Sequence, residues 1–260
     1  CNPNLKGICN YAVGYNNVDI ETASKLKIPI CNTPGVLTET TADLAWALIF
    51  AVSRRIVEAD KFTREGKFNG WAPQMFLGGD IYGKTLGIVG AGRIGTAVAK
   101  RANAFNMKIV YSDATANVEL EKKYSAKKKS MNELLEEADF VSLHTPLLPE
   151  TKHLIGSEQL RLMKSTAYLI NTARGPIIDE SALVTALKEN QIAGAGLDVY
   201  ENEPDITEGL TECVNAVLTP HIASASIDTR TKMGFLAYEN AVAIAENRIP
   251  AAIVNPEIYE

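Results

Sequence analysis

The spacing of hydrophobic residues becomes regular from Leu86 onward, where short apolar runs alternate with segments whose apolar residues recur at helical intervals. The runs predict buried strands at 86–89, 107–112, 140–144, 167–171, 193–199 and 216–218. The segments between them predict helices at 94–104, 130–137, 157–163 and 179–190. Parallel strands that are buried on both faces read as continuous apolar runs, and the alternating helices cover them. The pattern therefore predicts an α/β fold with a doubly wound, Rossmann-type parallel sheet.

Both ends of the chain lie outside this alternation and predict a second, smaller domain. The elements expected there are strands at 5–12 and 29–32, a helix at 18–26 and a long amphipathic helix at 228–247. We assign 1–34 and 226–260 to the smaller domain and 35–225 to the larger one. Between the two, residues 42–62 are apolar at the helical period without Gly or Pro. They predict one long bridging helix that Thr40 caps.

Composition excludes several classes of function. The 260 residues carry a formal net charge of −5, and no Lys or Arg run is long enough for nucleic-acid binding. The lysines at 127–129 lie near Glu119 and Glu121, so we interpret them as a solvated surface. The four cysteines are scattered, which argues against a metal site or a disulfide framework and favours the reducing cytoplasm. No signal peptide or membrane-length apolar run is visible.

A glycine-rich loop follows the first strand of the regular region. The string Gly90-Ala91-Gly92-Arg93-Ile94-Gly95 fits the GxGxxG pattern, which is weak by itself but here joins a buried strand to a helix. The first glycine permits a tight turn, the second lets a pyrophosphate approach the backbone, and the third lets strand and helix pack closely. The free N–H groups of the helix would then bind phosphate. We expect a dinucleotide site here rather than a plain glycine turn.

Asp113 ends the next predicted strand and bears on the choice of dinucleotide. A carboxylate at this position can accept hydrogen bonds from the ribose hydroxyls of NAD, and it would repel the 2′-phosphate of NADP. No arginine follows it within the next several residues. We therefore expect NAD in preference to NADP, the alternative being that Asp113 only caps its strand.

Three later strands end in residues suited to chemistry on a small carboxylic acid. Arg174 follows one strand, and its planar guanidinium suits two-point binding of a carboxylate. His221 follows the last strand, and its imidazole can exchange protons near neutral pH. Between them Asp198, Glu201 and Glu203 offer carboxylates that could orient this imidazole, and spacing does not choose among the three. Each group also has a structural alternative, a surface ion pair or an idle loop histidine.

The same segments resemble the D-isomer-specific 2-hydroxyacid dehydrogenase family over nearly the whole chain. The motifs that carry the resemblance are NYAVGYNNVD (10–19), TPGVLTETTADLA (33–45), GKTLGIVGAGRIG (83–95), VSLHTPLLPET (141–151), LINTARG (169–175), AGAGLDVYENEP (193–204) and PHIAS (220–224). The stretch TPGVLTETTADLAWAL is most similar to the glyoxylate/hydroxypyruvate reductase branch.

The resemblance implies roles for individual residues. Arg174 would bind the substrate carboxylate, His221 would protonate the carbonyl oxygen, and Glu203 would hold His221 protonated. The backbone N–H groups of Val13 and Gly14 would also grip the carboxylate. The NAD site would be lined, besides the three loop glycines, by Thr41, Arg93, Ile94, Asp113, Thr145, Pro146, Thr172 and Asp198, the last near the nicotinamide amide. The long helix after Thr40 would help to form a homodimer.

The resemblance also sets out what is expected of the whole chain. Family members usually carry several dozen further residues before the LKGICNYAVG strand, so the flavodoxin-like substrate domain is expected to be incomplete at its N-terminal end. The expected reaction is reduction of glyoxylate or hydroxypyruvate by NADH to glycolate or D-glycerate. The alternatives are a D-3-phosphoglycerate or D-lactate dehydrogenase, or a non-catalytic NAD-binding module similar to the corepressors that share this fold.

Overall fold

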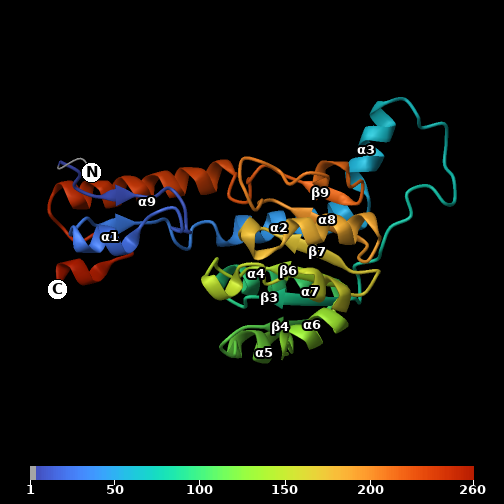
Figure 1. Ribbon diagram of the computed structural model, residues 1–260, viewed down its shortest axis with the longest axis horizontal. Helices are drawn as coiled ribbons and strands as arrows, with labels where there is room; N and C mark the ends of the chain where they lie inside the picture. Colours follow the sequence, from blue (N-terminus) through green and yellow to red (C-terminus); the bar gives the residue numbers. More distant parts are fainter. Residues whose placement is uncertain (1–3) are drawn as a thin grey trace. The chain divides into compact units, whose positions relative to one another are not determined.

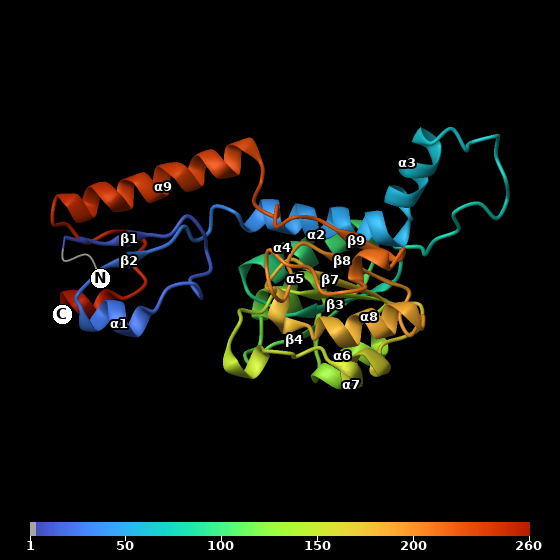
Figure 2. The same ribbon diagram turned by 45° about the horizontal axis from the view of Figure 1, so that its top comes forward.

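The computed structural model describes residues 4–260, which divide into two compact units. The smaller unit comprises the described residues up to Thr40 together with Ser224–Glu260, and the larger unit comprises Thr41–Ala223. The helices and strands of the smaller unit are β1 (Ile8–Cys9), α1 (Ile20–Lys25), β2 (Ile30–Cys31) and α9 (Ile227–Ala245). Strands β1 and β2 pair in parallel, with Cys9 opposite Cys31, and helices α1 and α9 lie beside them (Figure 2).

The larger unit is built on one parallel sheet of seven strands. They are β3 (Thr85–Val89), β4 (Lys108–Ser112), β5 (Lys127–Lys128), β6 (Phe140–Leu143), β7 (Tyr168–Asn171), β8 (Gly194–Leu197) and β9 (Ala216–Leu218). Their order across the sheet is β5-β4-β3-β6-β7-β8-β9, so the chain starts in the interior, winds to one edge, returns and winds to the other. The predicted doubly wound sheet is confirmed.

Helices cover both faces of this sheet (Figure 1). They are α2 (Thr38–Ser53), α4 (Arg93–Ala102), α5 (Val118–Tyr124), α6 (Met131–Glu137), α7 (Ser157–Leu162) and α8 (Glu180–Lys188). Successive strand residues point to opposite faces. Ile88 accordingly packs in the core under α2, α4 and α5, whereas Val89 packs in the core under α6, α7 and α8. Burial on both faces explains why these strands read as unbroken apolar runs.

The single helix predicted over residues 42–62 is wrong. The chain forms α2 up to Ser53 and then a separate α3 (Ile56–Arg64), with Arg55 between them in the left-handed region at φ 53°. The break has a tertiary cause, because the carbonyl of Ser53 accepts a hydrogen bond of 2.9 Å from the N–H of Gly79. A Cβ on Gly78 would lie 2.2 Å from the same carbonyl, so only glycine allows this approach.

Two further findings concern the surface of the described residues. Lys127 and Lys128, interpreted as a solvated surface, remain exposed but also form the edge strand β5, which the sequence pattern missed. Charged side chains on an edge strand discourage pairing with another sheet. None of the helices within residues 4–260 is long and apolar enough to cross a membrane.

Candidate active site

The glycine loop after β3 adopts the tight geometry that its pattern predicts. Gly90 has φ 91°, and a Cβ there would lie 2.7 Å from the backbone of His144 and Thr145. A Cβ on Gly95 would lie 2.1 Å from the carbonyl oxygen of Gly90. Both positions therefore require glycine, the first for its turn and the second for the packing of α4 against the loop.

The start of α4 leaves room for a phosphate group. Gly92 is the N-cap residue, supplies no side-chain hydrogen bond, and has no atom within 4 Å of the place where a Cβ would stand. The first N–H groups of a helix carry partial positive charge and need partners. An open approach to them fits a dinucleotide pyrophosphate.

Thr172, directly after β7, gives an independent sign that this edge of the sheet fits a ligand. Its side chain is buried, and its Oγ1 has no hydrogen-bond partner, a condition that it shares among the described residues only with Thr33 of the smaller unit. A buried hydroxyl without a partner is costly. A polar atom of a cofactor lying on the strand ends would satisfy it.

Asp113 hydrogen-bonds to the glycine loop at residues 90–95, the phosphate loop. Its Oδ2 accepts a hydrogen bond of 2.7 Å from the N–H of Ala91, and its Oδ1 accepts one of 3.1 Å from the N–H of Thr115. The sequence analysis found no cation immediately after Asp113, but Nζ of Lys128 donates to the carbonyl of Ala114 at 3.0 Å. The end of β4 therefore has both an anion, Asp113, and a nearby cation, Lys128 of the edge strand β5.

The three catalytic candidates follow three neighbouring strands. Arg174 follows β7, Glu203 lies in the turn after β8, and His221 follows β9. Because β7, β8 and β9 are adjacent and parallel, their carboxyl ends share one edge of the sheet. Ligands of open α/β sheets bind at this edge.

His221 is held by Glu203. Its Nδ1 lies 2.8 Å from Oε2 of Glu203, and the other carboxylate oxygen, Oε1, accepts a hydrogen bond of 3.0 Å from the N–H of Tyr200. The backbone of His221 has φ 54°, and its N–H donates to the carbonyl of Asp198 at 2.9 Å. About half of the imidazole is exposed, so Nε2 is the ring atom available to a substrate.

Arg174 lies within the electrostatic reach of the same pair. Desolvation lowers the pKa of its guanidinium, and the negative charge of Glu203 opposes that shift. Asn171 fixes the segment that carries it, because the amide of Asn171 donates to the carbonyl of Arg174 at 2.9 Å and its Oδ1 accepts from the N–H of Ala173 at 3.0 Å. The sequence analysis missed Asn171, although a buried polar residue at a strand end was a visible signal.

The other two carboxylates of the segment after β8 face elsewhere. Asp198 is fully buried and accepts three hydrogen bonds, from the hydroxyl of Thr219 at 2.6 Å and from the N–H groups of Ile222 and Ala223 at 2.8 Å each. Asp198 thereby fixes the loop that carries His221. The carboxylate of Glu201 lies 2.6 Å from Nε2 of His153 instead. Among the three acids, the structure puts only Glu203 against the His221 ring.

The remaining residues predicted to bind the cofactor also lie in the larger unit. Arg93 and Ile94 open α4, Thr145 and Pro146 follow β6, and Thr41 is buried in the first turns of α2. No cluster of three or more His, Cys, Asp or Glu side chains in the described part of the chain could hold a metal ion.

The predicted carboxylate-binding backbone of Val13 and Gly14 lies in the smaller unit. The side chain of Asn32 donates to the carbonyl of Val13 at 2.8 Å, and that of Asn10 donates to the carbonyl of Gly14 at 2.8 Å. These two side-chain amides fix the conformation of the loop from within the smaller unit. Its part in substrate binding stays a prediction.

Comparison with known proteins places these features in a family. The sequence profile described as "D-isomer specific 2-hydroxyacid dehydrogenase, NAD binding domain" matches residues 46–223. A glyoxylate reductase of Korarchaeum cryptofilum is 53% identical over 260 residues, which cover 99% of this chain and 78% of that protein.

Solved structures agree in fold and sequence. The crystal structure of a glyoxylate reductase from Paecilomyes thermophila superposes with a TM-score of 0.87 at 39% identity, over 96% of this chain and 75% of that one. An NADPH-dependent glyoxylate/hydroxypyruvate reductase from Sinorhizobium meliloti, solved with citrate, has a TM-score of 0.87 at 35% identity, over 95% of this chain and 78% of that one. The family profile matches most of the larger unit, and the glyoxylate reductase relative matches 99% of this chain. The chain therefore belongs to the D-isomer specific 2-hydroxyacid dehydrogenases.

Proposed function

We propose that this dehydrogenase reduces glyoxylate or hydroxypyruvate with a nicotinamide cofactor, giving glycolate or D-glycerate. The observation that carries the proposal is the contact between Glu203 and Nδ1 of His221 beside Arg174, at the edge of the sheet where the phosphate loop also opens. Relatives of this chain that carry the name glyoxylate reductase support the choice of substrate.

Each of the three side chains has a separate role in the proposed reaction. A nicotinamide bound at the strand ends would supply the hydride for the carbonyl carbon of the keto acid. The guanidinium of Arg174 pairs with the substrate carboxylate through two parallel hydrogen bonds. Because Nδ1 of His221 faces Glu203, the proton for the carbonyl oxygen leaves from Nε2. The carboxylate of Glu203 stabilises the imidazolium before the transfer and fixes the direction in which the ring points.

A substrate panel on the full-length protein tests the proposal. With NADH, we expect kcat/KM to be highest for glyoxylate and hydroxypyruvate, and lower for pyruvate and for phosphohydroxypyruvate. Arg174→Lys keeps the charge but loses the planar fork, so we expect KM for glyoxylate to rise at least about tenfold. A preference for pyruvate or for the phosphorylated acid would replace the proposed substrate. Absence of turnover on all four, with a stable protein partner, would favour a corepressor-like module.

We also propose that NADH is preferred over NADPH. Asp113 supports this preference, because a half-buried carboxylate at the end of β4 can accept from ribose hydroxyls and repels a 2′-phosphate. Lys128 works in the opposite direction, since its ammonium group lies at Ala114, beside Asp113. The preference is therefore expected to be moderate, and a related reductase is named as NADPH-dependent.

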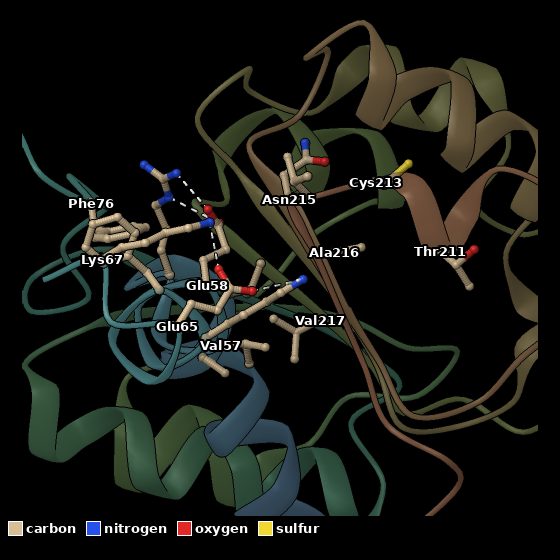
Figure 3. A pocket seen from close by; sticks show the side chains of 16 residues that line it. Val57, Glu58, Glu65, Lys67, Phe76, Thr211, Cys213, Asn215, Ala216 and Val217 are labelled. Carbon is tan, nitrogen blue, oxygen red and sulfur yellow. Dashed lines mark hydrogen bonds and ion pairs between the residues drawn. The ribbon is translucent and has the colours of Figure 1, made fainter.

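A homodimer is the assembly we propose. Helix α3 and the loop after it project from the sheet, and α3 has no buried residue (Figure 1). Trp71 is 82% exposed and Leu77 65% exposed in that loop, and Val57 of α3 is exposed as well. Between α3 and the edge strand β9 lies a groove with an apolar side at Val57 and Val217 and a charged rim that includes Glu58 (Figure 3).

A second copy of the same chain is the occupant that this surface fits. An unpaired edge strand beside exposed apolar side chains is a surface that proteins usually cover. A twofold axis through α3 and the loop after it would bring the same apolar residues of both copies together and would bury the β9 edge of each copy.

A further inference from the structure

Glu180 is a buried acid outside the site described above that contacts the turn on which Glu203 lies. It is the first residue of α8, and only 1% of it is exposed. Its Oε1 accepts a hydrogen bond of 2.8 Å from the N–H of Glu201, and its Oε2 accepts one of 2.5 Å from the hydroxyl of Thr207. Glu203 lies between these two donors in the sequence. One carboxylate therefore holds both ends of the turn that presents Glu203 to His221.

Other contacts attach the same turn to the segment of Arg174. A Cβ on Gly175 would lie 1.8 Å from the carbonyl carbon of Tyr200, so the two backbones touch where Gly175 follows Arg174. His153 pairs with the carboxylate of Glu201 at 2.6 Å, and its N–H donates to the carbonyl of Pro176 at 2.8 Å. The turn and the Arg174 segment are thus packed against each other, and Glu180 hydrogen-bonds to the turn.

Burying the carboxyl group of Glu180 costs free energy of desolvation, which its hydrogen bonds offset. Desolvation raises the pKa of its carboxyl group, the bonds from Thr207 and Glu201 oppose this shift, and the nearby charge of Glu201 adds to it. A buried acid is tolerated where it satisfies buried donors, and its removal leaves those donors without partners. At this position the donors are the N–H and the hydroxyl at the two ends of the turn.

We propose that Glu180 is a positioning residue for the reduction, which acts by keeping the Glu203 carboxylate on Nδ1 of His221. The proposal rests on the proposed function of His221 as proton donor. It predicts that the contribution of Glu180 to the rate passes through Glu203. It also predicts that loss of Glu180 changes the protonation behaviour of the site as well as the stability of the fold.

A double-mutant cycle tests this proposal. In the wild-type background, Glu180→Ala is expected to lower kcat for glyoxylate reduction about tenfold or more, and to move the high-pH fall of kcat/KM to lower pH. In the Glu203→Ala background, the same substitution is expected to change kcat less than about twofold, because the contact it supports is already lost. Glu180→Gln keeps one good acceptor and is expected to fall between wild type and Glu180→Ala.

Controls separate this effect from unfolding. The Kd for NADH is expected to stay within about twofold in every variant, because the phosphate loop lies on other strands. Glu189→Gln removes an exposed carboxylate at the other end of α8 and is expected to leave kcat unchanged. If Glu180→Ala does not fold, the same cycle with Glu180→Gln decides.

The outcomes are distinct. Equal losses in kcat in both backgrounds, or a pH profile that does not move, would show a purely structural role and overturn the proposal. If Glu203→Ala by itself leaves kcat and the pH profile at wild-type values, the proposed roles of Glu203 and His221 are wrong, independently of Glu180.

Discussion

Hydrogen bonds to Glu203 and Asp198 determine the position of the His221 imidazole. Glu203 holds Nδ1, the carbonyl of Asp198 holds the backbone N–H, and the buried carboxylate of Asp198 binds the loop just beyond it. The positive φ of His221 is therefore maintained by two residues of the segment that follows β8. The position of the His221 ring therefore depends on the segment after β8 as well as on its own loop after β9.

Spacing in the sequence could indicate the groups of this site but could not pair them. Asp198, Glu201 and Glu203 all follow the same strand, and each could reach a histidine on the next strand. The structure separates them by direction, with Asp198 buried under the loop, Glu201 on His153 and Glu203 on His221. Such directions depend on the path of the turn, which contacts from α8 determine. The family resemblance named Glu203 because it carries information that spacing lacks.

Two side chains, Asp113 and Lys128, are expected to set the preference between NADH and NADPH. Asp113→Ala removes the carboxylate that would repel a 2′-phosphate, so the ratio of kcat/KM for NADH to that for NADPH is expected to fall about tenfold or more. Lys128→Ala is expected to raise this ratio, because it removes the nearby cation. Lys127→Ala is the matched control, since adjacent strand residues point to opposite faces. An unchanged ratio in Asp113→Ala would contradict the assignment of the ribose site.

His144 makes the stability of the fold sensitive to acid. Desolvation lowers the pKa of its imidazole from 6.5 to about 3, so the folded chain binds this proton less readily than the unfolded chain. With the folded value depressed, stability is full above the unfolded value and is lost as the pH falls through 6.5 toward 3. Between pH 7 and pH 5 the loss from His144 amounts to at most about 2 kcal/mol.

Urea unfolding at the two pH values measures this effect. Wild type is expected to lose more free energy of unfolding between pH 7 and pH 5 than His144→Gln does. The substitution also alters the contact between Ser142 and Nε2 of His144, so the difference between the two pH values, rather than either value alone, is compared. Equal losses in the two proteins would contradict the account.

Among the helices and strands, the sequence pattern predicted the sheet but neither the edge strand β5 nor the break between α2 and α3. Six of its strands are apolar runs, because burial on both faces leaves little room for polar side chains. The edge strand β5 is Lys127–Lys128 and carries no such signal. The end of α2 depends on Gly79, whose N–H binds the carbonyl of Ser53 from a distant part of the chain. Local periodicity has no access to a contact of that kind.

A substitution at Gly175 tests whether the close packing of the Arg174 segment against the Glu203 turn is needed for activity. Gly175→Ala would put a methyl group 1.8 Å from the carbonyl carbon of Tyr200, so the Arg174 segment and the Glu203 turn must move apart. We expect kcat/KM for glyoxylate to fall at least about tenfold and the free energy of unfolding to fall by about 1–3 kcal/mol. Gly156→Ala is the control, since its nearest contact would be an ordinary 3.6 Å. Wild-type kinetics in Gly175→Ala would show that these segments move independently.

At the scale of the whole molecule, the proposed dimer makes a prediction about mass. Replacing Trp71 and Leu77 together by Glu is expected to shift the protein from dimer to monomer in sedimentation velocity, because charged side chains in an apolar contact are costly to bury. Val118→Glu changes an exposed residue at the start of α5, where an acid suits the helix, and is expected to keep the dimer. A monomeric wild type, or a dimer in the double variant, would contradict the proposed interface.

Replacing the proposed proton donor tests its role at the chemical step itself. Single-turnover reduction of glyoxylate by His221→Gln is followed with NADH already bound and its Kd verified against wild type. We expect a rate at least about a hundredfold below wild type with cofactor affinity unchanged, because the variant can still bind both ligands but has no acid at Nε2. A rate within about threefold of wild type would show that another group donates the proton, and the assignment of His221 would be wrong.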